Sequence, residues 1–290
     1  MKKISILFLL AGILSPAWSQ VGPMSEQGKA DVNKAANMMQ VAPPALAPLA
    51  PQVANFRDGY LKVWEQEMKA LDGIESKVFQ TVEYLEGQGA NQRLVREVYV
   101  GRLKMLKPNM ARLELWNNQD LENNKKGQFI YADGKYLWEF DHKAKKAYVD
   151  KLAAEGAGDN NLLSILFGTS ADKLRDRYDI RPDLSDAAVK DIKNHVVFDI
   201  LPKMPGDIQE FTKAQMILYT NPTQDSFMLP RRLWFMNQRS KYSITWELRD
   251  IVKRKDLAAR DFAPPKLPDE TWKSEWRTKP AQTPTVSNPK

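Results

Sequence analysis

The sequence contains no cysteine among its 290 residues. Disulfide bonds, zinc sites built from thiolates and a lipid anchor on a cysteine after the leader are therefore excluded. There are only two histidines, His142 and His195, and they lie in different segments with no metal-ligand spacing around them. We expect no metal site, no cofactor and no catalytic residues, so that the protein is not an enzyme and its stability comes from an apolar core.

Long apolar runs are also scarce. The run from Ile4 to Leu14 follows Lys2 and Lys3 and precedes the small-x-small pattern Ala17-Trp18-Ser19. It is shorter than the roughly 20 residues that span a bilayer. Together these features are typical of a signal peptide that is cleaved after Ser19. We expect an exported chain that is soluble in the periplasm or secreted.

Charge of one sign is not gathered anywhere along the chain. The formal net charge of +7 falls to +5 when Lys2 and Lys3 leave with the signal peptide, and the remaining charges are spread out. Nucleic-acid binding requires a basic patch or stripe. We therefore exclude nucleic acid as a partner and expect a monomer.

Composition divides the chain into four parts. A segment rich in proline, alanine and glutamine follows the signal peptide, and the last dozen residues are similar. Such sequences extend rather than pack. We predict a signal peptide at 1–19, a flexible linker at 20–55, one folded domain at 56–278 and a disordered tail at 279–290.

Two segments have helical patterns. Tyr60, Trp64, Met68 and Leu71 share one face of a predicted helix from Phe56 to Gly73. A second, densely apolar segment at 160–167 stops at a glycine, which predicts a short buried helix, and 170–177 extends the helical signal.

Elsewhere the apolar period is two, which predicts strands. These segments are 76–84, 94–106, 110–116, 128–132, 135–141, 145–152, 178–181, 196–201, 214–219, 227–235 and 240–252. Eleven antiparallel strands with two helical insertions predict a mainly β protein of the α+β class. We expect a strongly curved, unclosed half-barrel with helices on its concave face.

One strand pair is apolar on both faces. Asp133-Gly134 favours a two-residue turn, which places Ile130 opposite Leu137 on one face. The other face then carries four aromatic residues, Phe129, Tyr131, Tyr136 and Trp138. A sheet of this kind must cover a core with one face and something else with the other.

Three sequence blocks resemble the periplasmic lipoprotein carriers of the LolA, LolB and LppX-like group, in particular its planctomycete-type branch. The first is Leu106 to Leu113, similar to a basic-Pro-Asn turn that leads into a strand. The second is Ile130 to Phe140, with Asp-Gly-Lys followed by Leu-Trp. The third is Phe198 to Lys203, which resembles a Leu-x-Pro-Lys strand end. The resemblance runs in register from about Trp64 to Trp272.

This resemblance implies a carrier that holds acyl chains in a dry cavity between the sheet and the helices. The implied lining, in the strand parity that we favour, comprises Trp64, Met68, Leu71, Leu113, Leu115, Ile130, Leu137, Leu163, Leu166 and Phe167. A one-residue slip would instead place the four aromatic residues of the 128–141 pair in the cavity. Simple core packing is the alternative for each of these residues.

The same resemblance implies that Lys107 fastens the lid helices. The carriers commonly have arginine there, and lysine keeps the charge but lacks the planar fork. The alternative is a solvated lysine in a turn.

The implied partners are lipid or lipoprotein acyl chains, together with an inner-membrane release complex and an outer-membrane acceptor. A lipid-binding, peptide-binding or structural module of the cell envelope that does not transport remains the alternative function.

Overall fold

The computed structural model describes residues 46–87, 91–118, 128–142, 144–152, 170–238, 240–267 and 269–277. The predicted signal peptide, helix at 160–167 and tail at 279–290 lie outside these residues. Leu163, Leu166 and Phe167, which we predicted in the cavity lining, therefore lie outside the described chain. No described helix is long and apolar enough to cross a membrane.

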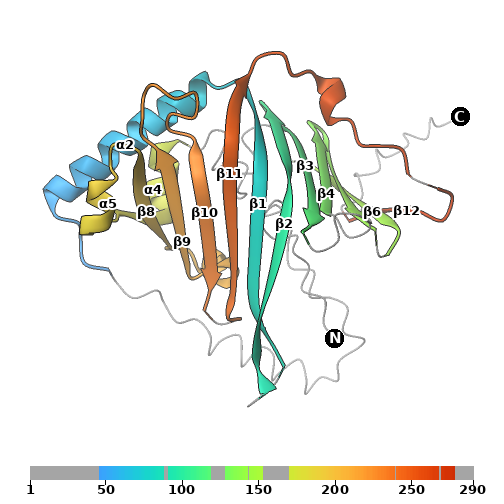
Figure 1. The fold of residues 1–290 in the computed structure, drawn as a ribbon, viewed down its shortest axis with the longest axis horizontal. Helices are drawn as coiled ribbons and strands as arrows, with labels where there is room; N and C mark the ends of the chain where they lie inside the picture. Colours follow the sequence, from blue (N-terminus) through green and yellow to red (C-terminus); the bar gives the residue numbers. More distant parts are fainter. Residues whose placement is uncertain are drawn as a thin grey trace, which may run out of the picture.

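The strands form one curved sheet that does not close, with β7 and β12 as its two edges (Figure 1). Across the sheet the order is β12-β6-β5-β4-β3-β2-β1-β11-β10-β9-β8-β7. The strand bounds are β1 Gly73–Glu86, β2 Arg93–Leu106, β3 Met110–Asn117, β4 Gln128–Asp133, β5 Tyr136–Asp141, β6 Lys146–Lys151, β7 Tyr178–Pro182, β8 His195–Pro202, β9 Lys213–Tyr219, β10 Pro230–Asn237, β11 Tyr242–Arg254 and β12 Lys273–Trp276. The predicted mainly β, unclosed half-barrel is confirmed. The twelfth strand is a correction, because β12 pairs in parallel with β6 where eleven antiparallel strands were expected.

Helix α2 (Pro51–Ala70) crosses the concave side of the sheet (Figure 1). It starts with proline in its first turn, where the missing N–H costs no helical hydrogen bond. It buries Leu61, Trp64 and Met68. The predicted start at Phe56 was too late, so residues 51–55, which we assigned to the linker, are helical. The segment before α2 is also held, since Arg181 donates to the carbonyl oxygen of Ala47 at 2.6 Å.

Three short helices lie between the strands of the second half. They are α4 (Ala171–Arg177), α5 (Asp186–Lys190) and α6 (Pro205–Glu210). Helix α4 follows the predicted helical signal at 170–177 and is capped by Ser170, whose hydroxyl accepts from the amide of Lys173. An ion pair of 2.7 Å between Arg175 and Asp58 joins α4 to α2.

The β4–β5 hairpin has the predicted faces but a different turn. Gly134, with a φ of 93°, and Lys135 form the connection in place of Asp133-Gly134. The carboxylate of Asp133 accepts from the amides of Lys135 and Tyr136 at 2.8 and 2.7 Å, which stabilises this turn. Ile130 is consequently opposite Glu139 rather than Leu137. The pairing moves by two residues in total, so Ile130 and Leu137 still share a face.

The second apolar face of this hairpin is covered by the chain that follows β11. Trp272 packs on Phe140 with ring centroids 6.0 Å apart, and Tyr131 belongs to the same buried cluster. The short 3-10 helix η3 (Ala259–Phe262) lies against β3 and β4. In Figure 1 this segment runs from β11 around the outer side of the sheet to β12. The aromatic face therefore packs against this protein's own C-terminal segment.

His142 lies within this outer aromatic cluster and should make stability depend on pH. The centroid of its ring is 4.9 Å from that of Phe129 and 5.2 Å from that of Trp272, and Nε2 has no hydrogen-bond partner within the described ranges. Burial lowers the pKa of His142 below its usual value, against the opposing charge of Asp141. The unfolded chain then binds a proton more readily than the folded chain.

We expect the resulting stability to be complete above about pH 6.5, the usual histidine pKa, and to be lost as the pH falls below it. His142→Phe should reduce this loss, because phenylalanine has no proton to gain. Denaturant unfolding at pH 7.5 and 5.5 measures the difference. An equal loss of unfolding free energy in both proteins would contradict the assignment.

Candidate functional site

The concave face carries one apolar cluster that includes seven of the predicted lining residues. Their exposed fractions are at most 4%. They are Trp64, Met68, Leu71, Leu113, Leu115, Ile130 and Leu137. The structure brings these residues together from α2, β3, β4, β5 and the chain after α2.

Strand alternation produces this lining. In β3 the buried positions are Ala111, Leu113 and Leu115, while their neighbours are more exposed. Leu113 is directly opposite Ile130 in β4. Facing side chains in adjacent strands lie in contact, so the inward row is continuous from strand to strand. The alternative parity, with the aromatic residues inside, does not occur.

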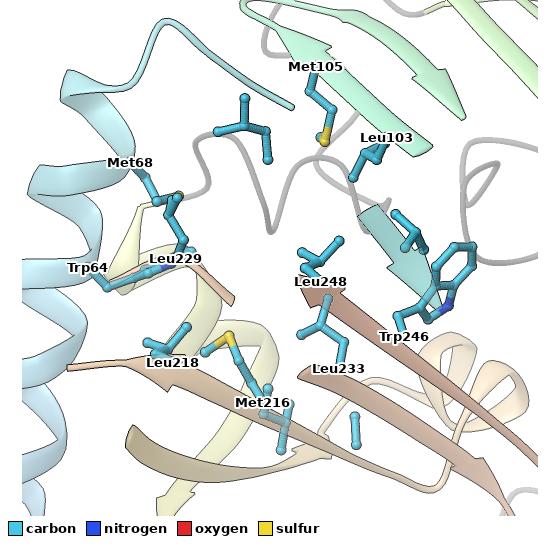
Figure 2. Close-up of a cluster of buried hydrophobic side chains, with 14 of the residues drawn as sticks. Trp64, Met68, Leu103, Met105, Met216, Leu218, Leu229, Leu233, Trp246 and Leu248 are labelled. Atoms are coloured by element: carbon cyan, nitrogen blue, oxygen red, sulfur yellow. The ribbon is translucent and has the colours of Figure 1, made fainter. Parts of the chain in front are cut away.

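The other half of the lining comes from strands, and from the chain just before β10, for which we predicted no lining residues. Figure 2 shows Trp64 and Met68 pointing from α2 toward Leu229 and Leu218, with strands β2, β10 and β11 contributing further apolar side chains. The additional residues are Leu103, Met105, Met216, Leu218, Leu229, Leu233, Trp246 and Leu248. Their period-two spacing is visible in the sequence, but two of the three blocks that carry the resemblance lie in the first half of the sheet.

Lys107 connects the β2–β3 turn to the end of α2. Its Nζ donates to the carbonyl oxygen of Met68 and, at 3.0 Å, to that of Lys69. Its backbone amide donates to the backbone carbonyl oxygen of Asp72 at 2.9 Å. Carbonyls in the last turn of a helix lack helical partners and carry partial negative charge, so a cation there is favourable. Burial lowers the pKa of Lys107, against the charge of Asp72. This contact has the geometry of a fastening for α2.

Removing this contact should loosen the C-terminal end of α2. Lys107→Leu leaves the two carbonyls without their donor, and we expect a loss of about 1 kcal/mol because the site is partly exposed to water. Amide hydrogen exchange should become faster in the last turn of α2. Lys203→Leu is the matched control, since Lys203 donates in the same way to the carbonyl of Arg175 at the end of α4. Equal exchange rates in α2 for both variants would contradict a fastening role for Lys107.

The side chains gathered at this site are apolar and buried, so the site is a hydrophobic cluster on the concave face. No group of three or more His, Cys, Asp or Glu side chains that could hold a metal occurs within the described part of the chain. A pocket of about 100 Å³ lies elsewhere, on the outer face, between Arg102, Lys104, Arg112 and Glu114. It is smaller than the roughly 300 Å³ at which ligand pockets begin.

Comparisons with known proteins return similar shapes at low sequence identity. No family model matches the chain, and no curated protein matches it. An uncharacterized conserved protein from Thermus thermophilus aligns with a TM-score of 0.41 and 11% identity, over 76% of this chain and 99% of that one. An outer membrane lipoprotein-sorting protein domain from Vibrio parahaemolyticus aligns with a TM-score of 0.34 and 11% identity, over 71% of this chain and 97% of that one.

A chain of the MucA/MucB complex of Pseudomonas aeruginosa aligns with a TM-score of 0.35 and 13% identity, over 72% of this chain and 61% of that one. The similar structures thus include the lipoprotein-sorting class that the sequence blocks resemble. At these TM-scores they decide no activity.

Proposed function

We propose that this protein is an exported carrier that binds lipid or lipoprotein acyl chains between α2 and the concave face of the sheet. The observation that carries the proposal is the apolar cluster that α2 shares with an unclosed sheet. Acyl chains require a dry apolar lining and few polar contacts. The carrier would act in the periplasm after cleavage following Ser19.

Helix α2 is suited to act as a lid because no backbone–backbone hydrogen bond joins it to a strand in the described part of the chain. Its nearest elements are β7 and α4. Apart from Lys107, charged contacts hold it through Asp58 with Arg175, at 2.7 Å, and through Glu67 with Lys253, at 3.0 Å. Ion pairs this exposed contribute at most about 1 kcal/mol each. Apolar packing therefore dominates the attachment of α2.

The free energies of burial favour replacing the packing of α2 on the sheet with a bound acyl chain. The three buried side chains of α2 contribute about 1.5–3 kcal/mol each, roughly 5–9 kcal/mol together. An acyl chain with about 15 methylenes gains about 0.8 kcal/mol for each one buried, or about 12 kcal/mol. A bound chain can thus offset the displacement of α2 from the sheet.

The absence of cysteine makes the test of lid movement direct. Probes placed by Val63→Cys on α2 and Val252→Cys on β11 occupy exposed positions, at 37% and 47%. We expect a lipopeptide or fatty acyl ligand to lengthen the distance between the probes, as measured by spin-label or fluorescence spectroscopy. Lys107→Leu should bind at least as tightly as the native protein but transfer the ligand to an acceptor more slowly, because closure of the lid assists release.

Mass spectrometry of protein purified from its own periplasm would identify bound acyl species. Folded protein that binds neither acyl ligands nor hydrophobic dyes would contradict the carrier proposal. It would favour the non-transporting module, in which the same face holds a protein segment. Binding without transfer to membranes or to an outer-membrane acceptor would support a lipid-binding module that does not transport.

A further inference from the structure

A row of polar side chains lies on the concave face along the three central strands, among the apolar lining. Glu97 in β2 accepts from the hydroxyls of Tyr84 at 3.1 Å and Tyr99 at 2.7 Å. Its position opposite buried Val82 places it on the concave face. Tyr242, which pairs with Tyr84, completes the row. Burial and the carboxylate of Glu97 raise the pKa of Tyr84 and Tyr99, so both hydroxyls keep their protons and donate.

Two donors next to this row have no acceptor in the part of the chain that the structure describes. Gln80 and Trp246 are direct partners in the β1–β11 ladder, and Gln80 is also opposite Tyr99. Their exposed fractions are 1% and 7%, and neither Gln80 Nε2 nor Trp246 Nε1 has a hydrogen-bond partner among the described residues. Leaving a buried donor unpaired is unfavourable for the folded protein. Two such donors, adjacent on the proposed binding face, indicate a place where a ligand supplies the acceptor.

The surroundings define the chemistry of that acceptor. Both donors are uncharged and lie in an apolar lining, which suits a neutral carbonyl oxygen. Glu97 and Tyr99 are successive inward-facing residues of β2, and Tyr99 is directly opposite Gln80. The carboxylate of Glu97 repels a second carboxylate that is bound beside Gln80 and Trp246. A free fatty acid is therefore disfavoured relative to an ester or amide of the same chain.

We propose that Gln80 and Trp246 bind the acyl carbonyl of an ester or amide ligand and that the Glu97 carboxylate excludes free fatty acids. This inference rests on the proposed acyl-chain function and specifies its ligand class. The same chemistry occurs in acylglycerol lipids and in the acylated N-terminus of lipoproteins. The tyrosines hold Glu97 in place through their hydroxyls.

The test compares probes with one chain length and different head groups. Palmitoyl glycerol and a palmitoylated peptide present a carbonyl, hexadecyl glycerol ether lacks it, and palmitate at pH 8 presents a carboxylate. Affinity is measured by displacement of a hydrophobic dye. We expect the ester or the amide to bind about tenfold more tightly than the ether, from one to two hydrogen bonds. Palmitate should bind at least as weakly as the ether.

Variants then assign the effect to these two donors. Gln80→Leu combined with Trp246→Phe should bring the ester and the ether to within about twofold of each other, because neither side chain can then donate to a carbonyl oxygen. Trp138→Phe and Gln92→Leu are the matched controls. Trp138 is an unpartnered indole on the outer face, and Gln92 is exposed. Gln80→Leu alone should raise the melting temperature of the ligand-free protein, because it removes an unpaired buried donor.

The outcomes separate this inference from the carrier proposal. Equal binding of ester, ether and palmitate by the native protein would overturn the inference and leave the carrier proposal intact. An ester preference that survives in the double variant would also overturn it. Binding of none of the probes would overturn both. If the ester binds but the palmitoylated peptide does not, the carbonyl belongs to a lipid, and the reverse result assigns it to a lipoprotein.

Discussion

Replacing Trp64 with alanine should lower the free energy of unfolding by about 3–5 kcal/mol, the usual cost of deleting a fully buried large aromatic side chain. Trp64 has an exposed fraction of 0% and is the largest side chain that α2 buries. The neighbouring buried side chains of α2, Leu61 and Met68, already pack into the same cluster. Denaturant unfolding followed by far-ultraviolet circular dichroism measures the change.

Trp64→Phe is the matched control for this result. It keeps a ring in the cluster and removes an indole N–H for which the described chain provides no hydrogen-bond partner. We therefore expect it to be much less destabilising than alanine. A loss below about 1 kcal/mol for Trp64→Ala, outside the range typical of buried aromatic residues, would show that α2 does not pack on the sheet. In the proposed function, Trp64→Ala should also admit hydrophobic dyes more readily, since the lid loses its largest anchor.

Gly101→Ala should destabilise the protein by about 3 kcal/mol or more, or prevent folding. An ideal Cβ at Gly101 would lie 1.8 Å from the carbonyl oxygen of Glu114 and 2.8 Å from its carbonyl carbon. Both are backbone atoms of β3, which is hydrogen-bonded between β2 and β4. They cannot move away without breaking the ladder in the middle of the concave face.

Gly59→Ala provides the opposite expectation within the same protein. Gly59 lies in α2, and a Cβ there would meet nothing within 4 Å. Alanine favours the helix by up to about 1 kcal/mol relative to glycine. We therefore expect Gly59→Ala to raise the melting temperature and Gly101→Ala to lower it. Two losses of similar size would show that backbone proximity at Gly101 is not the cause.

Much of the fold is accessible from local pattern. The period of two is enough to place Leu113 and Leu115 on one face, and the helical stripe identifies Trp64 and Met68. These predictions succeed because alternation in a strand and the 3.6-residue repeat of a helix are properties of the backbone. Edge strand β12 was missed because its four residues are all exposed and show no alternation.

The site was predictable in part. Gln80 shares the parity of Val78 and Val82 in β1, so the sequence did carry a signal that this polar residue points inward. The lack of partners for its amide and for the indole of Trp246 became visible only when β1 and β11, distant in the sequence, were paired.

The sequence by itself determined the strands other than β12, most of helix α2, the two apolar faces of the β4–β5 hairpin and the absence of thiolate chemistry. Each of these follows from the residues of one segment or from composition. Tertiary structure alone decided which apolar face α2 would cover, that the C-terminal segment packs on the other, and that Lys107 reaches the end of α2. The physical reason is that burial of apolar surface is non-directional. Either face of a strand pair that is apolar on both sides can be buried by any apolar segment. Only the complete chain specifies which segment covers each face.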